Sequence, residues 1–205
     1  MYKTKLFPVL IKKLDQLEGT DIPENRKKVL QPLIDFIQQQ KNSGEAIKLN
    51  FICTHNSRRS QLAQVWAQAI SAHFGIKTEC FSGGTEETVF FKNAVETLRE
   101  TGFIIKSGSG ENPHFQVFYS EEAEPLVCYS KVYDAPENPT ENFAAVMTCS
   151  HADENCPFIP GSKARIPLDY KDPKQFDDTP LAMEKYEERS DQIASEMIYV
   201  FQHIK

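Results

Sequence analysis

The sequence predicts an α/β protein in which a parallel four-stranded sheet carries helices on both faces. From residue 47 onward, short apolar runs alternate with segments whose apolar residues recur three or four positions apart, a pattern typical of parallel sheets. The composition is that of a globular protein, since 40% of the 205 residues are hydrophobic and 25% are charged. A chain of this length can form one sizeable core, with or without an appendage.

Charge and hydropathy exclude several classes of function. The formal net charge of −6 gives no general attraction to nucleic acid or to an anionic membrane surface, so an anionic substrate needs a local site. No run approaches the roughly 18 apolar residues that span a bilayer. The apolar run from Leu6 to Ile11 is too short for a signal peptide and is flanked by lysines. We therefore expect a cytoplasmic protein, in which five spaced cysteines indicate catalysis or metal binding.

Residues 1–45 are expected to form a helical extension. Apolar residues recur three or four positions apart in residues 6–17 and again in residues 29–37. Gly19 and Gly44 are expected to end these two helices. The helical hairpin is expected to pack on the main domain or on a second subunit, without any chemistry of its own.

The catalytic domain, residues 46–205, is expected to alternate strands with helices. The expected strands are 47–52, 76–81, 143–148 and 164–168, and the expected helices carry apolar faces at 62–70, 90–98 and 183–204. Residues 114–133 are aromatic and β-branched and predict an inserted β-hairpin, as an added edge, a lid or a partner surface. Active sites of parallel sheets lie beyond the carboxyl ends of strands, where both Cys53 and Cys149 fall.

The segment from Cys53 to Ser60 has the chemistry of an anion-binding loop that holds a nucleophile. It joins an apolar strand to a helix, so backbone N–H groups and the positive end of the helix can face one anion. Arg59 can offer two parallel hydrogen bonds to a tetrahedral oxyanion. The same positive field favours a thiolate, to which Ser60 can donate its hydroxyl. The alternative is a buried strand-end cysteine followed by solvated arginines.

The loop resembles the anion loop of the thioredoxin-coupled arsenate reductases, whose fold is that of the low-molecular-weight tyrosine phosphatases. Its residues from Cys53 to Gln61 match Cys-Thr-x-Asn-Ser-x-Arg-Ser-Gln. The resemblance implies that Cys53 is the nucleophile, Arg59 the oxyanion ligand and Ser60 the thiolate stabiliser, while Asn56 braces the loop. The implied anion-binding residues are Thr54, His55, Asn56, Ser57, Arg58 and Arg59.

Three positions depart from the family pattern. His55 stands where the family usually has glycine, which bears on the backbone shape of the loop. Arg58 stands where a further cysteine is frequent, and it is expected to add positive charge at the rim. Gln64 stands where a carboxylate ligand for potassium is expected, so we predict no potassium site.

A second pair of cysteines, Cys149 and Cys156, follows the third expected strand. Their spacing and the Ala-Asp…Cys-Pro pattern match the redox segment of the same family, for which simple phosphatases of this fold have no use. A zinc site is one alternative, but seven positions with one histidine between them are poor metal spacing. Inert cysteines are the other, and we expect this of Cys80 and Cys128. The polar segment between the pair is expected to be mobile, as a disulfide relay requires.

Asp172 is the expected general acid. An isolated Asp-Pro pair is usually a turn, but Asp172-Pro173 lies between the fourth expected strand and the last helix, where the family has its acid. Its role would be to protonate the departing oxygen. The neighbouring Asp169, Asp177 and Asp178 are expected to be solvated or capping residues.

The resemblance implies an arsenate reductase with an intramolecular disulfide relay. Cys53 attacks arsenate, Cys149 attacks Cys53 and releases arsenite, and Cys156 then attacks Cys149, leaving a disulfide that thioredoxin reduces. No organic cofactor or catalytic metal is expected. The first alternative is a low-molecular-weight protein tyrosine phosphatase acting on a phosphate ester through Cys53, Arg59 and Asp172, and only the cysteine pair separates the two. The second is a binding module whose hairpin and extension recruit a partner.

Overall fold

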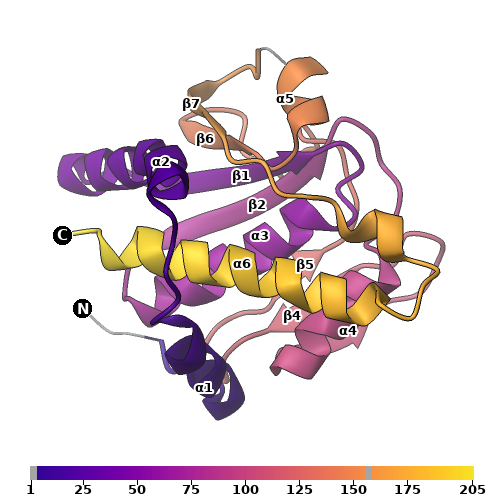
Figure 1. Ribbon diagram of the computed structural model, residues 1–205. Coiled ribbons are helices and arrows are strands. Elements are labelled where there is room, and N and C mark those ends of the chain that lie inside the picture. Colours follow the sequence, from indigo (N-terminus) through magenta and orange to yellow (C-terminus); the bar gives the residue numbers. More distant parts are fainter. Residues whose placement is uncertain (1–3, 156–157) are drawn as a thin grey trace.

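The structure is a computed structural model that describes residues 4–155 and 158–205. Its elements are α1 (Pro8–Leu17), α2 (Glu24–Ser43), β1 (Ile47–Cys53), α3 (Arg59–His73), β2 (Thr78–Gly84), α4 (Lys92–Thr101), β3 (Ile104–Ser107), β4 (Phe115–Phe118), β5 (Leu126–Cys128), β6 (Phe143–Met147), α5 (Ser150–Asn155), β7 (Ser162–Pro167), the 3₁₀ turn η1 (Pro173–Phe176) and α6 (Ala182–Gln202). Figure 1 shows the main sheet above α6, with α5 beyond the sheet.

The predicted parallel sheet is confirmed, with strand order β2-β1-β6-β7. Both central strands are buried along nearly their whole length, which explains their continuous apolar runs. Alternate residues face two apolar clusters, so Phe51 joins the large core shared with α3 and α6, while Ile52 joins a smaller cluster under α5. Ile52 pairs with Met147 across β1 and β6. The segments that follow these two strands therefore leave the sheet at the same edge.

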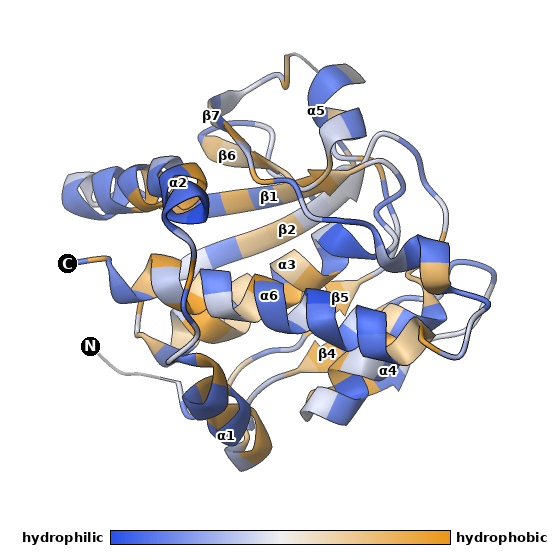
Figure 2. Cartoon of the chain, viewed as in Figure 1, coloured by the Kyte–Doolittle hydropathy of each residue, from blue (hydrophilic) through white to orange (hydrophobic). Residues whose placement is uncertain are grey.

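The helical extension packs on its own chain. Leu10 and Leu14 of α1 and Leu30 and Leu33 of α2 belong to the same core as the sheet. Figure 2 shows hydrophobic and hydrophilic residues alternating along α6, as expected of a helix that packs on one side.

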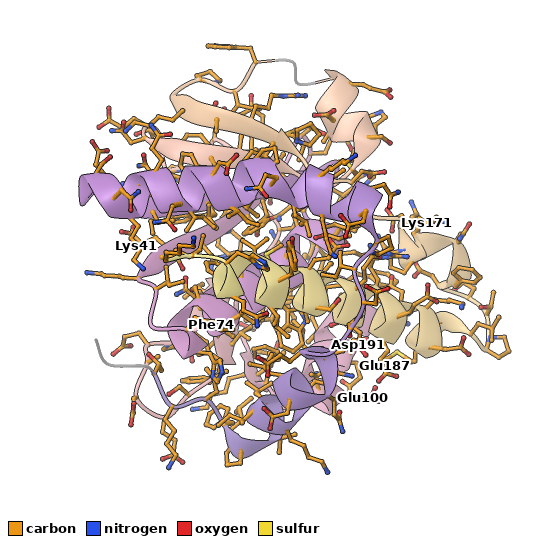
Figure 3. All side chains as sticks on the ribbon, turned by 60° about the vertical axis from the view of Figure 1, so that its left-hand side comes forward. Lys41, Phe74, Glu100, Lys171, Glu187 and Asp191 are labelled. Atoms are coloured by element: carbon orange, nitrogen blue, oxygen red, sulfur yellow. The ribbon has the colours of Figure 1, made fainter. Side chains whose placement is uncertain are left out.

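Ion pairs fix both helices of the extension to α6. Lys13 pairs with Asp191 at 2.7 Å, and Figure 3 shows Asp191 next to α1. Arg26 forms two hydrogen bonds with Glu196, at 2.7 and 2.9 Å. Helix α6, the last element of the chain, is therefore the surface on which the first two helices are held.

The predicted hairpin is the β4–β5 pair of a three-stranded antiparallel sheet. Phe115 of β4 pairs with Cys128 of β5, and Phe118 pairs with Ile104 of β3, a strand that the sequence did not predict. Phe115, Val117 and Cys128 are buried in the main core. The insert therefore extends the core. Within residues 4–155 and 158–205, no helix combines the length and the apolar character needed to cross a membrane.

Candidate active site

Cys53 ends β1 in a buried position and faces Ser60. The Cys53 Sγ and Ser60 Oγ atoms lie 3.1 Å apart. Ser60 Oγ also accepts a hydrogen bond of 2.9 Å from the Asn56 side-chain amide. Because that bond occupies the oxygen as an acceptor, the single hydroxyl hydrogen of Ser60 is free to point at the sulfur. This geometry is what stabilisation of a Cys53 thiolate requires.

Asn56 determines the backbone shape of the loop. Its φ is +45°, and within residues 53–60 left-handed backbone is confined to this residue, a type that tolerates the conformation. Its side-chain oxygen accepts from Gln61 Nε2 at 3.2 Å and from the Lys131 backbone N–H at 3.0 Å. The left-handed residue is therefore Asn56 and not His55, so the loop does not need glycine at position 55.

The carbonyl groups of Thr54, His55 and Ser57 accept hydrogen bonds from the segments that follow β2 and β5. The Thr54 carbonyl accepts from Glu86 N at 2.8 Å, and the Ser57 carbonyl accepts from Phe91 N at 3.0 Å. The His55 carbonyl accepts from two hydroxyl groups, at 2.8 and 3.0 Å. With these carbonyl groups bound to other parts of the chain, the predicted arrangement, in which the loop N–H groups face an anion, is compatible with the backbone of the loop.

Gly84, at the end of β2, allows this close approach. A Cβ atom at this position would lie 2.5 Å from the Glu86 carbonyl oxygen and 2.7 Å from that of Thr54. The supporting role of this residue was not predicted from the sequence. The Gly83-Gly84 pair at a strand end was the signal that could have revealed it.

Arg59 and Asp172 meet at the mouth of the loop, although they lie 113 positions apart. Arg59 Nη2 donates to Asp172 Oδ2 at 2.7 Å, and Nη1 donates to the Tyr170 carbonyl at 3.0 Å. The other Asp172 oxygen accepts from the backbone N–H of Lys174 at 3.0 Å, which caps η1. Asp169 is exposed and lies 3.9 Å from Arg59. The structure thus brings the expected oxyanion ligand into contact with the expected acid, at the end of the loop that begins with Cys53.

Arg58 does not place its charge at the rim, so that prediction is wrong. Its side chain is buried, stacks on the Phe91 ring at 3.9 Å, and donates hydrogen bonds of 2.5 Å to Tyr186 and to Asp177. Asp177 ends the η1 turn, but its carboxylate is bound to Arg58 and Tyr186 instead of solvent. Burial and the bond to Asp177 raise the pKa of Tyr186, which keeps it a hydrogen-bond donor. Asp178 is exposed, as predicted.

Cys149 lies beside the anion loop at the end of the neighbouring strand. It is buried and shares a small apolar cluster with Cys53. Its Sγ atom lies 3.4 Å from the Thr54 hydroxyl and accepts a hydrogen bond of 3.3 Å from the Ala152 N–H. The Thr54 hydroxyl also lies 3.3 Å from His151 Nδ1. Cys156, the predicted partner of Cys149, lies outside the described residues.

The other two cysteines are far less suited to reaction. Burial raises the pKa of Cys80 and of Cys128 to about 12, so both stay protonated at neutral pH. The Gln64 amide donates to the Cys80 carbonyl at 3.0 Å and so faces β2. In the part of the chain that the structure describes, no group of three His, Cys, Asp or Glu residues has the arrangement of a metal site.

The helical extension supports the site indirectly through Tyr170. This fully buried ring lies under the guanidinium of Arg26, at 4.8 Å from the ring centroid, and the same guanidinium pairs with Glu196. The Tyr170 carbonyl is the acceptor for Arg59. We expected the extension to have no link to the chemistry, and this contact was not predicted. Arg26 and Arg59 are each more than a hundred residues from Tyr170 in the sequence.

Comparison with known proteins agrees with this geometry. Residues 48–118 match the model of the low molecular weight phosphotyrosine protein phosphatase family. Arsenate reductase 2 of Staphylococcus haemolyticus is 30% identical over 124 residues, which are 60% of this chain and 76% of that protein. Arsenate reductase of Halalkalibacterium halodurans is 27% identical over 129 residues, which are 63% of this chain and 76% of that protein.

The fold has a solved counterpart as well. The low molecular weight protein tyrosine phosphatase from T. tengcongensis superposes with a TM-score of 0.50 at 17% identity, covering 74% of this chain and 95% of that one. At this identity the likeness concerns the fold alone. The match to the family model and the relative at 30% identity place the chain in the family of arsenate reductases and low-molecular-weight protein tyrosine phosphatases, and it belongs to that family.

Proposed function

We propose that this enzyme is an arsenate reductase that uses Cys53 as its nucleophile and Cys149 as the first thiol of a disulfide relay. The observation that carries the proposal is the position of Cys149, buried at the neighbouring strand end with its sulfur 3.4 Å from the Thr54 hydroxyl of the anion loop. A phosphatase needs no thiol there. A reductase needs one, because two electrons must reach the arsenic.

The first step is attack of the Cys53 thiolate on arsenate held by the loop N–H groups and Arg59. A sulfur–arsenic bond forms and an arsenic–oxygen bond breaks. Asp172 gives its proton to the departing OH group, which leaves as water because hydroxide is a poor leaving group. Ser60, 3.1 Å from the sulfur, stabilises the thiolate before the attack.

The second step is attack of the Cys149 thiolate on the sulfur of Cys53. A disulfide forms, the sulfur–arsenic bond breaks, and its electron pair stays on arsenic, which leaves as arsenite. Cys156 then attacks Cys149 and frees the Cys53 thiolate, and thioredoxin reduces the Cys149–Cys156 disulfide by exchange. The thiols supply both electrons, so this scheme uses no organic cofactor or catalytic metal. It suits the cytoplasm, where thioredoxin keeps thiols reduced.

The test is arsenite production with thioredoxin, thioredoxin reductase and NADPH. Cys149→Ser should stop turnover, because the arsenylated Cys53 then has no internal thiol to attack it. Cys156→Ser should accumulate a Cys53–Cys149 disulfide that mass spectrometry detects after arsenate treatment. Cys80→Ala is the matched control and should keep its activity, since that thiol is buried in β2. A wild-type protein that forms no arsenate-dependent disulfide would exclude the relay.

The second candidate function is phosphate ester hydrolysis, as in a protein tyrosine phosphatase. It is favoured by the contact between Arg59 and Asp172, because these two residues and Cys53 would supply the oxyanion ligand, the acid and the nucleophile of that reaction, and water would complete the cycle. Hydrolysis of a phosphotyrosine analogue, measured in parallel, tests it. Cys149→Ser and Cys156→Ser should retain this activity, whereas both should lose arsenate reduction.

A further inference from the structure

Two adjacent arginines of the anion loop bind the two ends of one short turn. Asp172 precedes the η1 turn and Asp177 follows it. Arg59 pairs with Asp172 at 2.7 Å, while Arg58 pairs with Asp177 at 2.5 Å. The turn that carries the proposed acid is thus attached to the loop at two points.

The two attachments differ in what a bound anion does to them. Arg59 must direct two parallel N–H groups to the oxyanion, so the anion competes with Asp172 for the same donors. The negative charge of the anion also repels the carboxylate of Asp172. Binding of an arsenate or phosphate dianion therefore weakens the Arg59–Asp172 attachment at the moment when Asp172 has to be in position.

The Arg58 attachment has no such competitor. The Arg58 side chain is only 8% exposed and Tyr186 is fully buried. The Tyr186 hydroxyl accepts from Arg58 Nε and donates to Asp177 Oδ1, both at 2.5 Å, so all three side chains are joined in a closed network. Burial alone would lower the pKa of Arg58, but Tyr186 and Asp177 outweigh it and the pKa is raised. The guanidinium is therefore a permanent charge, and its bonds to Tyr186 and Asp177 hold it against the turn.

We propose that Arg58, Asp177 and Tyr186 form a strut that keeps the acid-bearing turn on the anion loop when Arg59 binds the substrate oxyanion. The three are positioning residues, acting through Asp172. This inference rests on the proposed chemistry of Cys53, Arg59 and Asp172, and it holds for arsenate and phosphate ester substrates alike.

Hydrogen exchange of the backbone amides of residues 174–179, with and without inorganic phosphate, tests the strut without any need for turnover. In the wild-type protein, phosphate should change these rates by less than about twofold. In Asp177→Asn, Arg59–Asp172 is the remaining charged attachment, so phosphate should speed exchange by about tenfold. Asp191→Asn is the control. It removes a different aspartate ion pair, the one between Asp191 of α6 and Lys13, and should behave like wild type.

If Asp177→Asn does not fold, Tyr186→Phe is used in its place. This variant removes only the hydroxyl between Arg58 and Asp177. It should show the same phosphate dependence to a smaller degree. Equal exchange with and without phosphate in the folded variant would overturn the strut. Protection of Cys53 from iodoacetamide by phosphate is measured on the same wild-type sample. If phosphate does not protect Cys53, the proposed anion site is wrong, and so is the inference that rests on it.

A double-mutant cycle with Asp172→Asn gives the second readout. Asp177→Asn should lower kcat by about tenfold in the otherwise wild-type enzyme, with little change in KM. In the Asp172→Asn background it should cause no further loss, since the residue on which it acts is already disabled. Equal losses in both backgrounds would show that the network contributes stability only.

Discussion

The segments that follow β1 and β6 begin alike and are built differently. A buried cysteine lies at the start of each, since Cys53 is the last residue of β1 and Cys149 comes two residues after β6. The anion loop, residues 53–60, is fixed by buried polar side chains such as Asn56 and Ser60. The segment after Cys149 forms the short helix α5, in which Ala152 is buried while Ser150, His151 and Glu154 are exposed.

This difference matches two different tasks. A loop that binds an oxyanion and stabilises a thiolate benefits from groups that are already in place, because no reorganisation is then needed during the reaction. In the proposed relay, Cys149 first bonds to Cys53 and then to Cys156. Its sulfur therefore has to lie near Cys53, while the segment that follows it has to be exposed on the surface. Thr54 links the two segments, because its hydroxyl lies near both the Cys149 sulfur and His151 Nδ1.

The largest effect is expected from Cys53→Ser, because both segments depend on this sulfur. Serine is not ionised at neutral pH, and the loop cannot make it so, so arsenate reduction and ester hydrolysis should both fall by more than about 10³-fold. The circular dichroism spectrum should stay unchanged. Substantial turnover by this variant would show that Cys53 is not the nucleophile. The two segments would then have no shared catalytic sulfur.

Asp172→Asn should lower kcat by about 10²-fold and flatten one limb of its pH profile. The amide keeps the shape of the side chain but has no proton to give, so affinity for phosphate should change little. Asp178→Asn is the matched control, since Asp178 is an exposed neighbour. An unchanged pH profile in Asp172→Asn would place the acid elsewhere.

Arg59→Lys should lower kcat/KM by more than about tenfold, which corresponds to roughly 1.4 kcal/mol. The ammonium keeps the charge but cannot form two parallel hydrogen bonds to a tetrahedral oxyanion. Arg99→Lys, on the surface of α4, provides the control for a general effect of arginine replacement. A smaller loss than tenfold would mean that Arg59 acts as a point charge.

The smallest effect, and the sharpest for the comparison, is expected from Thr54→Val. The variant keeps the side-chain shape and the loop N–H but removes the hydroxyl next to Cys149. Loss of about 1 kcal/mol should slow arsenate-dependent disulfide formation by about fivefold while ester hydrolysis stays nearly unchanged. Rapid chemical quenching followed by mass spectrometry measures the rate of disulfide formation. Equal slowing of both reactions would show that Thr54 serves the anion loop only.

The parts of the molecule that local sequence patterns determine were predicted well. The four parallel strands follow from apolar runs, and the loop follows from the spacing of Cys53, Arg59 and Ser60 between a strand and a helix. These features depend on neighbours in the sequence. Asp172 came from its order in the chain together with the family resemblance, and the structure places it on Arg59.

The parts that depend on distant partners were not predicted. Nothing near Arg58 in the sequence indicates that Asp177 and Tyr186, 119 and 128 positions away, bury its charge. Strand β3 has four mostly exposed residues, of which only Ile104 and Ile105 are apolar, so its sequence is too short to indicate a strand and it is defined by pairing with β4. Burial of a charge and pairing of an exposed strand are both decided by tertiary structure.

The attachment of the first two helices to the last one has a consequence for biosynthesis. Arg26 and Glu196 are 170 positions apart. At about 5–20 residues per second, the helices of the extension emerge on the order of ten seconds or more before the surface that receives them. Throughout that interval α2 lacks α6, one of the elements on which it packs, so the apolar face that carries Leu30 and Leu33 stays partly uncovered in the newborn chain.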